Sequence, residues 1–112
     1  MTGESSLRSP IRDLPALRGV VAAGVDVFGR LDFVVANAGI SPGQFRETTP
    51  EEDAQAWKDA IDVNLTGVWN TTRAAIPHII AGNRGGAIVL TGSTAGLRGM
   101  GGGGYGLPST AW

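Results

Sequence analysis

The sequence predicts a small α/β fold in which a long helix joins two parallel β-strands. Two segments with helical spacing of apolar residues, from Asp13 to Phe28 and from Thr49 to about Ala81, alternate with two short apolar runs, LDFVVANAG and AIVLTGS. Strands without polar alternation are typical of parallel sheets that are covered on both faces. We therefore expect the order helix–strand–helix–strand, with a crossover helix between two buried strands.

The first predicted helix begins after Asp13 and ends at Gly29. The Asp13 carboxylate can accept hydrogen bonds from the free amides of the first turn, and glycine suits the left-handed conformation that ends a helix. The apolar positions, three or four residues apart, are Leu14, Leu17, Val21, Val25 and Phe28. Two internal glycines weaken this helix by up to about 1 kcal/mol each relative to Ala.

The second predicted helix begins at the sequence TPEE. Thr49 is the expected N-cap, Pro50 suits the first helical position, and Glu52 completes a capping box. Roughly thirty residues at about 1.5 Å each make a single rod ~45 Å long. Its expected apolar stripe consists of Trp57, Ile61, Leu65, Val68, Thr72, Ile76 and Ile79.

Composition and charge exclude several classes of function. Charged residues make up 17% of the chain, the net charge is −1, and there is no Cys. These numbers speak against a nucleic-acid or acidic-membrane surface, a disulfide framework and a thiolate metal site. The single histidine, His78, lies in an apolar stretch without partner ligands, so we interpret it as structural and expect no metal. A polar N-terminus and the lack of a membrane-length apolar stretch predict a cytoplasmic protein.

We interpret residues 1–112 as a single domain with three parts. Residues 1–12 form an irregular lead-in, residues 13–96 hold the helix–strand–helix–strand core, and residues 97–112 form a Gly-rich tail. The tail matches G-x-G-x-x-G letter for letter. That pattern binds a pyrophosphate where a strand turns tightly into a helix. Here Pro108 follows the glycines and no helical pattern does, which favours a flexible loop.

Three motifs have an ordinary structural interpretation when each is taken alone. ANAG after the first apolar run is a common strand-to-loop turn. Asn64, in the middle of an apolar helix, is typical of a packing residue or a bend. Ser93, at the end of the second run, is more often a cap or turn hydroxyl. Their joint spacing, with Tyr105 twelve residues beyond Ser93, is much more specific.

Together, these motifs closely resemble the middle of the short-chain dehydrogenase/reductase family, over residues 12–105. ANAG is similar to the family's N-N-A-G after its fourth strand, DVNLTG to its catalytic-Asn segment, and IVLTGSTAG to its fifth strand with the catalytic Ser. Within the family, the sequence is similar to actinobacterial NAD-dependent members, including carveol-dehydrogenase-like enzymes. The resemblance implies a partial Rossmann-like fold, a doubly wound parallel sheet without its first strands and its C-terminal strands.

The resemblance also implies a reaction and the residues that perform it. The reaction is hydride transfer between NAD or NADP and a small-molecule alcohol/carbonyl pair. Tyr105 would be the general acid/base, Ser93 would hydrogen-bond the substrate oxygen, and Asn64 would hold a water in the proton relay. The residues implied to line the adenosine side of the cofactor, and to brace the sheet, are Asn37, Ala38 and Gly39.

The sequence departs from the family pattern on both sides of this segment. The family's Lys, which binds the nicotinamide ribose and lowers the pKa of the Tyr, is replaced by Ser109, and the only lysine, Lys58, matches no catalytic position. An unassisted Tyr has a pKa near 10, which leaves on the order of 0.1% phenolate at pH 7. The pyrophosphate turn T-G-x-x-x-G-x-G is not found either, and Pro10-Ile11 stands where the family has Asp-Val near the adenine.

These departures leave three interpretations of function. The chain is an oxidoreductase by descent that is inactive alone, a non-catalytic module that pairs with a full-length homologue through the helix at 50–81, or a gene remnant without function. Two strands do not make an independently stable sheet, and an apolar unpaired edge favours aggregation or a partner. We therefore expect poor folding of the chain alone and a homo- or hetero-oligomeric state.

Overall fold

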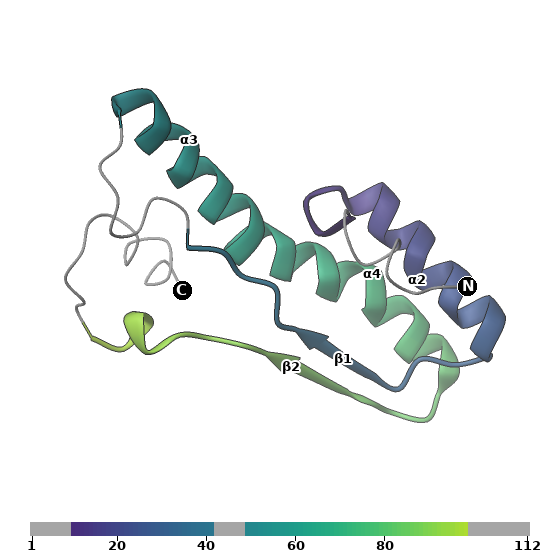
Figure 1. The fold of residues 1–112 in the computed structure, drawn as a ribbon. Helices are drawn as coiled ribbons and strands as arrows, with labels where there is room; N and C mark the ends of the chain where they lie inside the picture. The colour runs from purple at the N-terminus through teal and green to yellow at the C-terminus, as the bar shows by residue number, and fades with distance from the viewer. Residues whose placement is uncertain (1–9, 42–48, 99–112) are drawn as a thin grey trace.

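The chain folds into a layer of helices packed on one face of a two-stranded sheet (Figure 1). The computed structural model describes residues 10–41 and 49–98. The main elements are α2 (Leu14–Phe28), β1 (Phe33–Ala36), α3 (Pro50–Ile61), α4 (Gly67–Gly82) and β2 (Ala87–Leu90). Three short turns complete them: the 3-10 turns η1 (Pro10–Arg12) and η3 (Thr94–Gly96), and the π-helical turn η2 (Asp62–Thr66).

Strands β1 and β2 pair in parallel, as the sequence predicts. The register places Phe33 opposite Ala87 and Ala36 opposite Leu90. The ladder extends by one bond beyond β2, since the Thr91 amide donates to the Ala36 carbonyl at 3.0 Å. Because both strands run in the same direction, their carboxyl ends meet at one edge of the sheet.

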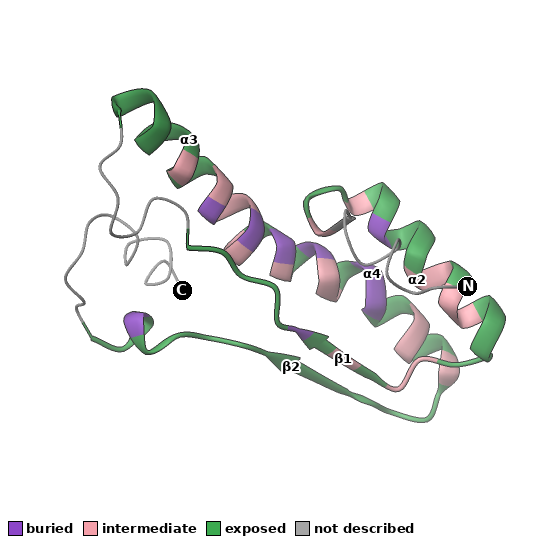
Figure 2. Cartoon of the chain, in the orientation of Figure 1, coloured by how far each residue is buried: buried purple, intermediate pink, exposed green. Residues whose placement is uncertain are grey.

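The expectation that both strands are buried on both faces is wrong for the residues that the structure describes. Phe33 is 73% exposed, Val35 is 62% exposed, and all four residues of β2 are exposed, whereas Ala36 is buried (Figure 2). Successive side chains of a strand point to opposite faces. Helices α2 and α4 cover only one of these faces. The continuous apolar pattern of the strands thus suits a sheet that is covered on both faces. Residues 10–41 and 49–98 cover only one of these faces.

Helix α2 has the ends that the sequence predicts. Asp13 Oδ1 accepts a hydrogen bond from the Ala16 amide at 3.1 Å. Gly29 adopts a left-handed φ of 80°, and its amide donates to the Val25 carbonyl at 2.7 Å. Both ends therefore follow from contacts within one turn of the chain.

The long helix begins as predicted but changes its hydrogen-bond pattern in the middle. The capping box is confirmed, because Thr49 Oγ1 accepts from the Glu52 amide at 3.2 Å and Glu52 Oε2 accepts from the Thr49 amide at 2.8 Å. The single α-helix expected over 50–81 is instead α3 and α4 joined by the π-helical η2, where the Gly67 amide donates to the Asp62 carbonyl. A π-turn rotates the face of the helix that follows it, and such turns are frequent at functional sites.

The buried face of this helix also differs from the predicted stripe of large side chains. Trp57 is 48% exposed and Ile76 is 40% exposed. The buried residues on η2 and the two helices are Ala60, Val63, Gly67, Asn70, Ala74 and Ala75. A Cβ at Gly67 would lie 3.2 Å from Ile11 Cδ1. A side chain at position 67 is therefore disfavoured because Ile11 of η1 packs closely against the helix there.

Polar contacts attach turn η1 to the long helix. Arg12 Nη2 donates to Asp59 Oδ1 at 2.6 Å and lies 3.4 Å from Asp62 Oδ2. The buried Asn70 donates from Nδ2 to the Ile11 carbonyl at 2.8 Å. Residues 10–12, expected to be irregular, thus form a docked turn at the start of η2.

Acidification is expected to remove the contribution of these ion pairs to stability. Hydrogen bonds from Arg12 lower the pKa of Asp59 below its usual range. A lowered folded-state pKa means that the contribution is complete above the ordinary carboxyl pKa near 3.9 and is lost as pH falls through the folded value. By far-UV circular dichroism, Asp59→Asn should lower the thermal midpoint at pH 7 and about pH 5. Its midpoint should converge on that of the wild type as the pH falls through the lowered pKa of Asp59, and a pH-independent difference would contradict the assignment.

Candidate functional site

Two of the predicted site residues lie just beyond the carboxyl ends of the two strands, and a third contacts the loop after β1. Asn37 directly follows β1, and Ser93 lies three residues beyond the end of β2. Asn64 is in the centre of η2 and contacts the loop that follows β1. In open α/β sheets, ligands bind outside the carboxyl ends of the strands. Tyr105 and the glycine run lie outside the residues that the structure describes.

Asn64 holds the backbone of the loop after β1. Its Nδ2 donates to the Ile40 carbonyl at 2.9 Å, and its Oδ1 accepts from the Ile40 amide at 2.8 Å. The carboxamide therefore satisfies both backbone groups of Ile40, as a neighbouring strand would. A Cβ at Gly39 would lie 3.4 Å from Asn64 Oδ1, so the loop runs close to the helix. This contact agrees with the structural interpretation of Asn64, and its role in a proton relay stays a prediction.

Ser93 caps the short turn η3. Its Oγ accepts from the Ala95 amide at 3.1 Å, and its backbone is extended. This is the cap role that a serine at the end of a strand commonly has. A hydroxyl has one hydrogen to donate besides its two lone pairs. The cap uses a lone pair, and no acceptor for the hydrogen is found among the described residues.

Thr91 is a site residue that sequence reasoning missed. Its Oγ1 donates to Asn37 Oδ1 at 2.9 Å, which joins the two strand ends. The signal that could have indicated Thr91 is the register of the two strands. Because Ala36 lies opposite Leu90, the residues that follow them, Asn37 and Thr91, are also neighbours. Both side chains are exposed. A hydroxyl and a carboxamide in these two positions are close enough to form a hydrogen bond.

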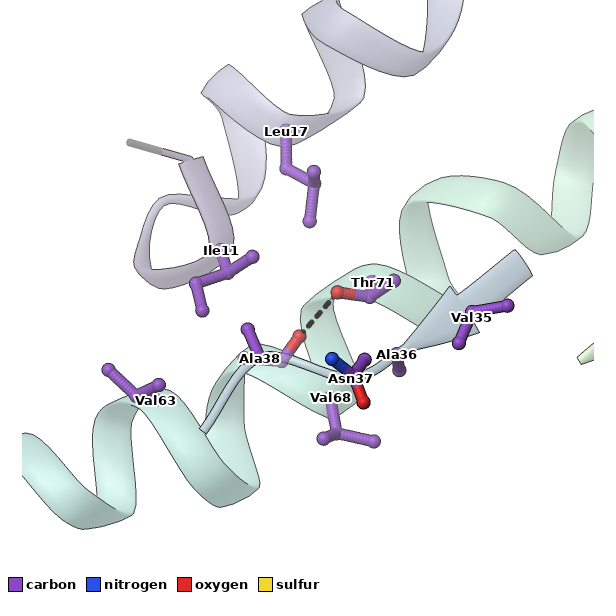
Figure 3. Close-up of a pocket in the computed structure, with 10 residues that line it drawn as sticks. Ile11, Leu17, Val35, Ala36, Asn37, Ala38, Val63, Val68 and Thr71 are labelled. Atoms are coloured by element: carbon purple, nitrogen blue, oxygen red, sulfur yellow. Dashed lines mark hydrogen bonds between the residues drawn. The ribbon is translucent and has the colours of Figure 1, made fainter. Parts of the chain in front are cut away.

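An apolar cavity of about 140 Å³ lies beside this loop (Figure 3). The Thr71 hydroxyl on its wall is used within α4, donating to the Gly67 carbonyl at 2.7 Å. Of the predicted adenosine-binding residues, Asn37 and Ala38 line the cavity and Gly39 does not. The full lining is Ile11, Leu17, Val35, Ala36, Asn37, Ala38, Val63, Gly67, Val68 and Thr71. Such walls suit a flat group with apolar faces, and Asn37 supplies a polar contact for its edge.

The structure adds two observations on metals and membranes. Within residues 10–41 and 49–98, no three or more His, Cys, Asp or Glu side chains are grouped to bind a metal ion. In that same part of the chain, none of the helices has the length and apolar character needed to cross a membrane. His78 is half-buried on α4.

The fold and the site define a class of protein. Residues 7–106 match the family described as short chain dehydrogenase. The chain belongs to this family, and its α/β fold is Rossmann-like, as predicted. Among solved structures, carveol dehydrogenase from Mycobacterium avium in complex with NAD has a TM-score of 0.77 and 40% identity, covering 92% of this chain and 37% of that one.

The narrower resemblance to carveol-dehydrogenase-like members is confirmed. The chain is 48% identical over 93 residues to (-)-trans-carveol dehydrogenase from Rhodococcus erythropolis, covering 83% of this chain and 33% of the relative. A short chain dehydrogenase from Mycobacterium paratuberculosis bound to NAD has 42% identity and a TM-score of 0.76, over 92% and 37% of the two chains. The chain therefore spans about a third of the length of these relatives.

Proposed function

We propose that this chain carries the central segment of a NAD- or NADP-dependent oxidoreductase that interconverts an alcohol and a carbonyl, and that the 112 residues alone are inactive. The observation that carries the proposal is the pair of hydrogen bonds between Asn64 and Ile40. It brings the π-turn of the long helix to the carboxyl end of β1, the edge at which such sheets bind ligands. The NAD complexes of two similar structures support the cofactor.

In this proposal, two side chains act on the substrate oxygen and a third holds a water of the proton relay. Tyr105 exchanges a proton with that oxygen, and Ser93 donates to it the hydrogen that the cap of η3 leaves free. Asn64 takes part in the proton relay while its side chain holds Ile40 in place. The nicotinamide, when bound, accepts or supplies the hydride.

The cavity beside β1 fits the adenine part of the cofactor. Its walls are apolar, and the Asn37 carboxamide supplies a polar contact at its rim. Ile11, at the position where the family has Asp-Val, forms part of the wall. Asn37 and Ala38 would contact the adenosine directly, and Gly39 would let the loop approach Asn64.

A chimera tests this proposal. Residues 12–105 replace the matching segment of the Rhodococcus erythropolis relative, which then supplies everything after Tyr105. We expect NAD-dependent oxidation of trans-carveol by the chimera, measured as NADH formation. Asp26→Asn, an exposed position on α2, is the matched control and should leave kcat unchanged. A folded chimera without activity, or with full activity after Tyr105→Phe, would contradict the proposal.

The isolated chain is not expected to bind NAD or NADH at millimolar cofactor. The sequence contains no T-G-x-x-x-G-x-G turn, whose backbone amides hold the pyrophosphate in this family. Isothermal titration calorimetry measures this directly, with the chimera as the positive control. Saturable binding by the chain alone would contradict this prediction, because it would show that the cavity and the Asn37 loop are sufficient to bind the cofactor.

A second candidate function is a binding module that pairs with a full-length homologue. The observation that favours it is the exposed apolar face of α4, where Trp69 is 60% and Ile80 is 71% exposed. The Arg73 guanidinium lies over the Trp69 ring, 5.5 Å from its centroid, a cation–π contact at the surface. Ile80→Glu should abolish co-purification with such a homologue, and Asp26→Asn should not. Unchanged co-purification of the Glu variant would exclude this face of α4 as the surface that binds the homologue.

A further inference from the structure

Thr91 forms hydrogen bonds with two consecutive residues at the carboxyl end of β1. Its amide donates to the Ala36 carbonyl at 3.0 Å, and its Oγ1 donates to Asn37 Oδ1 at 2.9 Å. Ser93, the candidate partner of the substrate oxygen, follows two residues later. The residue that directly follows β2 therefore lies between the cofactor side of the candidate site and its substrate side.

The hydroxyl of Thr91 restricts the Asn37 carboxamide. An exposed carboxamide rotates freely about its last side-chain bond unless a partner holds it, and it has two donors and one acceptor to present. With Oδ1 occupied by Thr91, Nδ2 stays on the other side. In Figure 3 the nitrogen of Asn37 lies on the side of Thr71 and the oxygen on the opposite side. No hydrogen bond to Nδ2 is found from the described residues, so its hydrogens stay available to a ligand.

We propose that Thr91 is a positioning residue for the cofactor, which holds the Asn37 carboxamide so that Nδ2 can donate to a heteroaromatic base in the apolar cavity. This inference rests on the proposed function for the identity of that base as adenine. The hydrogen bond itself, and the orientation it imposes, do not depend on catalysis. Thr91 acts through Asn37 and does not touch the base.

Nuclear magnetic resonance of the full chain tests the orientation. In wild type we expect one Asn37 side-chain NH₂ pair at a shifted position, because Oδ1 accepts a hydrogen bond. Thr91→Val keeps the shape of the side chain and removes the hydroxyl, so that pair should move to the averaged position of a free carboxamide. Thr91→Ser should restore it. Thr72→Val is the matched control, because the Thr72 hydroxyl bonds only the Trp69 carbonyl of its own helix at 2.8 Å. A Thr91→Val spectrum with an unmoved Asn37 pair would overturn the proposal.

The chimera supplies a second measurement, which decides the question if the isolated chain gives no dispersed spectrum. There Thr91→Val should raise KM for NAD about two- to tenfold, the value of one hydrogen bond, with kcat within about twofold of the parent. Thr91→Ser should return KM to the parent value. A purely structural role would lower the yield of folded enzyme without changing KM, so an unchanged KM overturns the proposal. An inactive chimera instead contradicts the proposed function and leaves the spectrum of Asn37 to decide the role of Thr91.

Discussion

Gly86→Ala is expected to lower the stability of the chimera by about 3 kcal/mol, the cost of forcing an extra group into a tightly packed contact. A Cβ at this position would lie 2.5 Å from the Asp32 carbonyl oxygen and 3.0 Å from Ile79 Cγ2. The carbonyl cannot move away easily, because it accepts the hydrogen bond of the Ala87 amide at 3.0 Å at the start of β2. The substitution therefore separates the first residues of both strands.

Gly19→Ala provides the matched control, since it is the same change without the same contact. A Cβ at Gly19 meets nothing within 4 Å, and the residue is inside α2. There, alanine should stabilise the helix by up to about 1 kcal/mol. Thermal unfolding followed by far-UV circular dichroism should thus show midpoint shifts of opposite sign. Equal midpoints for the two variants would mean that Gly86 and Asp32 are not in contact in solution.

Asn64→Ala is expected to lower kcat of the chimera on the order of 10²-fold, the usual size of a lost contribution to proton transfer. The change removes both hydrogen bonds to Ile40 and frees the loop after β1 from the π-turn. Kinetic measurements with NAD and trans-carveol give kcat and KM separately.

Asn64→Asp makes the same prediction more specific. Aspartate has nearly the same shape and still accepts from the Ile40 amide. Its second oxygen, however, would face the Ile40 carbonyl where Asn64 Nδ2 now donates at 2.9 Å. Two acceptors repel each other at that distance, so we expect kcat to fall for this variant as well. An aspartate variant with wild-type kcat would show that the hydrogen bond from Nδ2 has no part in positioning the loop.

Several elements were predictable from the sequence because local chemistry determines them. The end of α2 depends on the left-handed conformation of Gly29, and the start of α3 depends on the reciprocal hydrogen bonds of Thr49 and Glu52. These contacts join residues within one helical turn. Continuous apolar runs likewise indicated the two parallel strands, although residues 10–41 and 49–98 cover only one face of them.

The candidate site was predictable only in part. ANAG, Asn64 and Ser93 pointed to the edge at which both strands end, because their spacing resembles that of a known family. The contact between Asn37 and Thr91 was missed, since it joins residues 54 positions apart and depends on the register of β1 against β2. Tyr105 stays a prediction from resemblance.

Helix ends, strand order and family membership thus follow from residue types and spacing along the chain, because each depends on local hydrogen bonding or on motifs. The π-turn, the small-residue face of the long helix and the cavity depend on packing between segments far apart. η2 brings Asn64 to Ile40, 24 residues away, and Gly67 is buried because Ile11 packs against it. The spacing of apolar residues along the chain does not indicate either of these contacts. The tertiary structure decides them, since it alone determines which backbone and side-chain groups of distant segments meet.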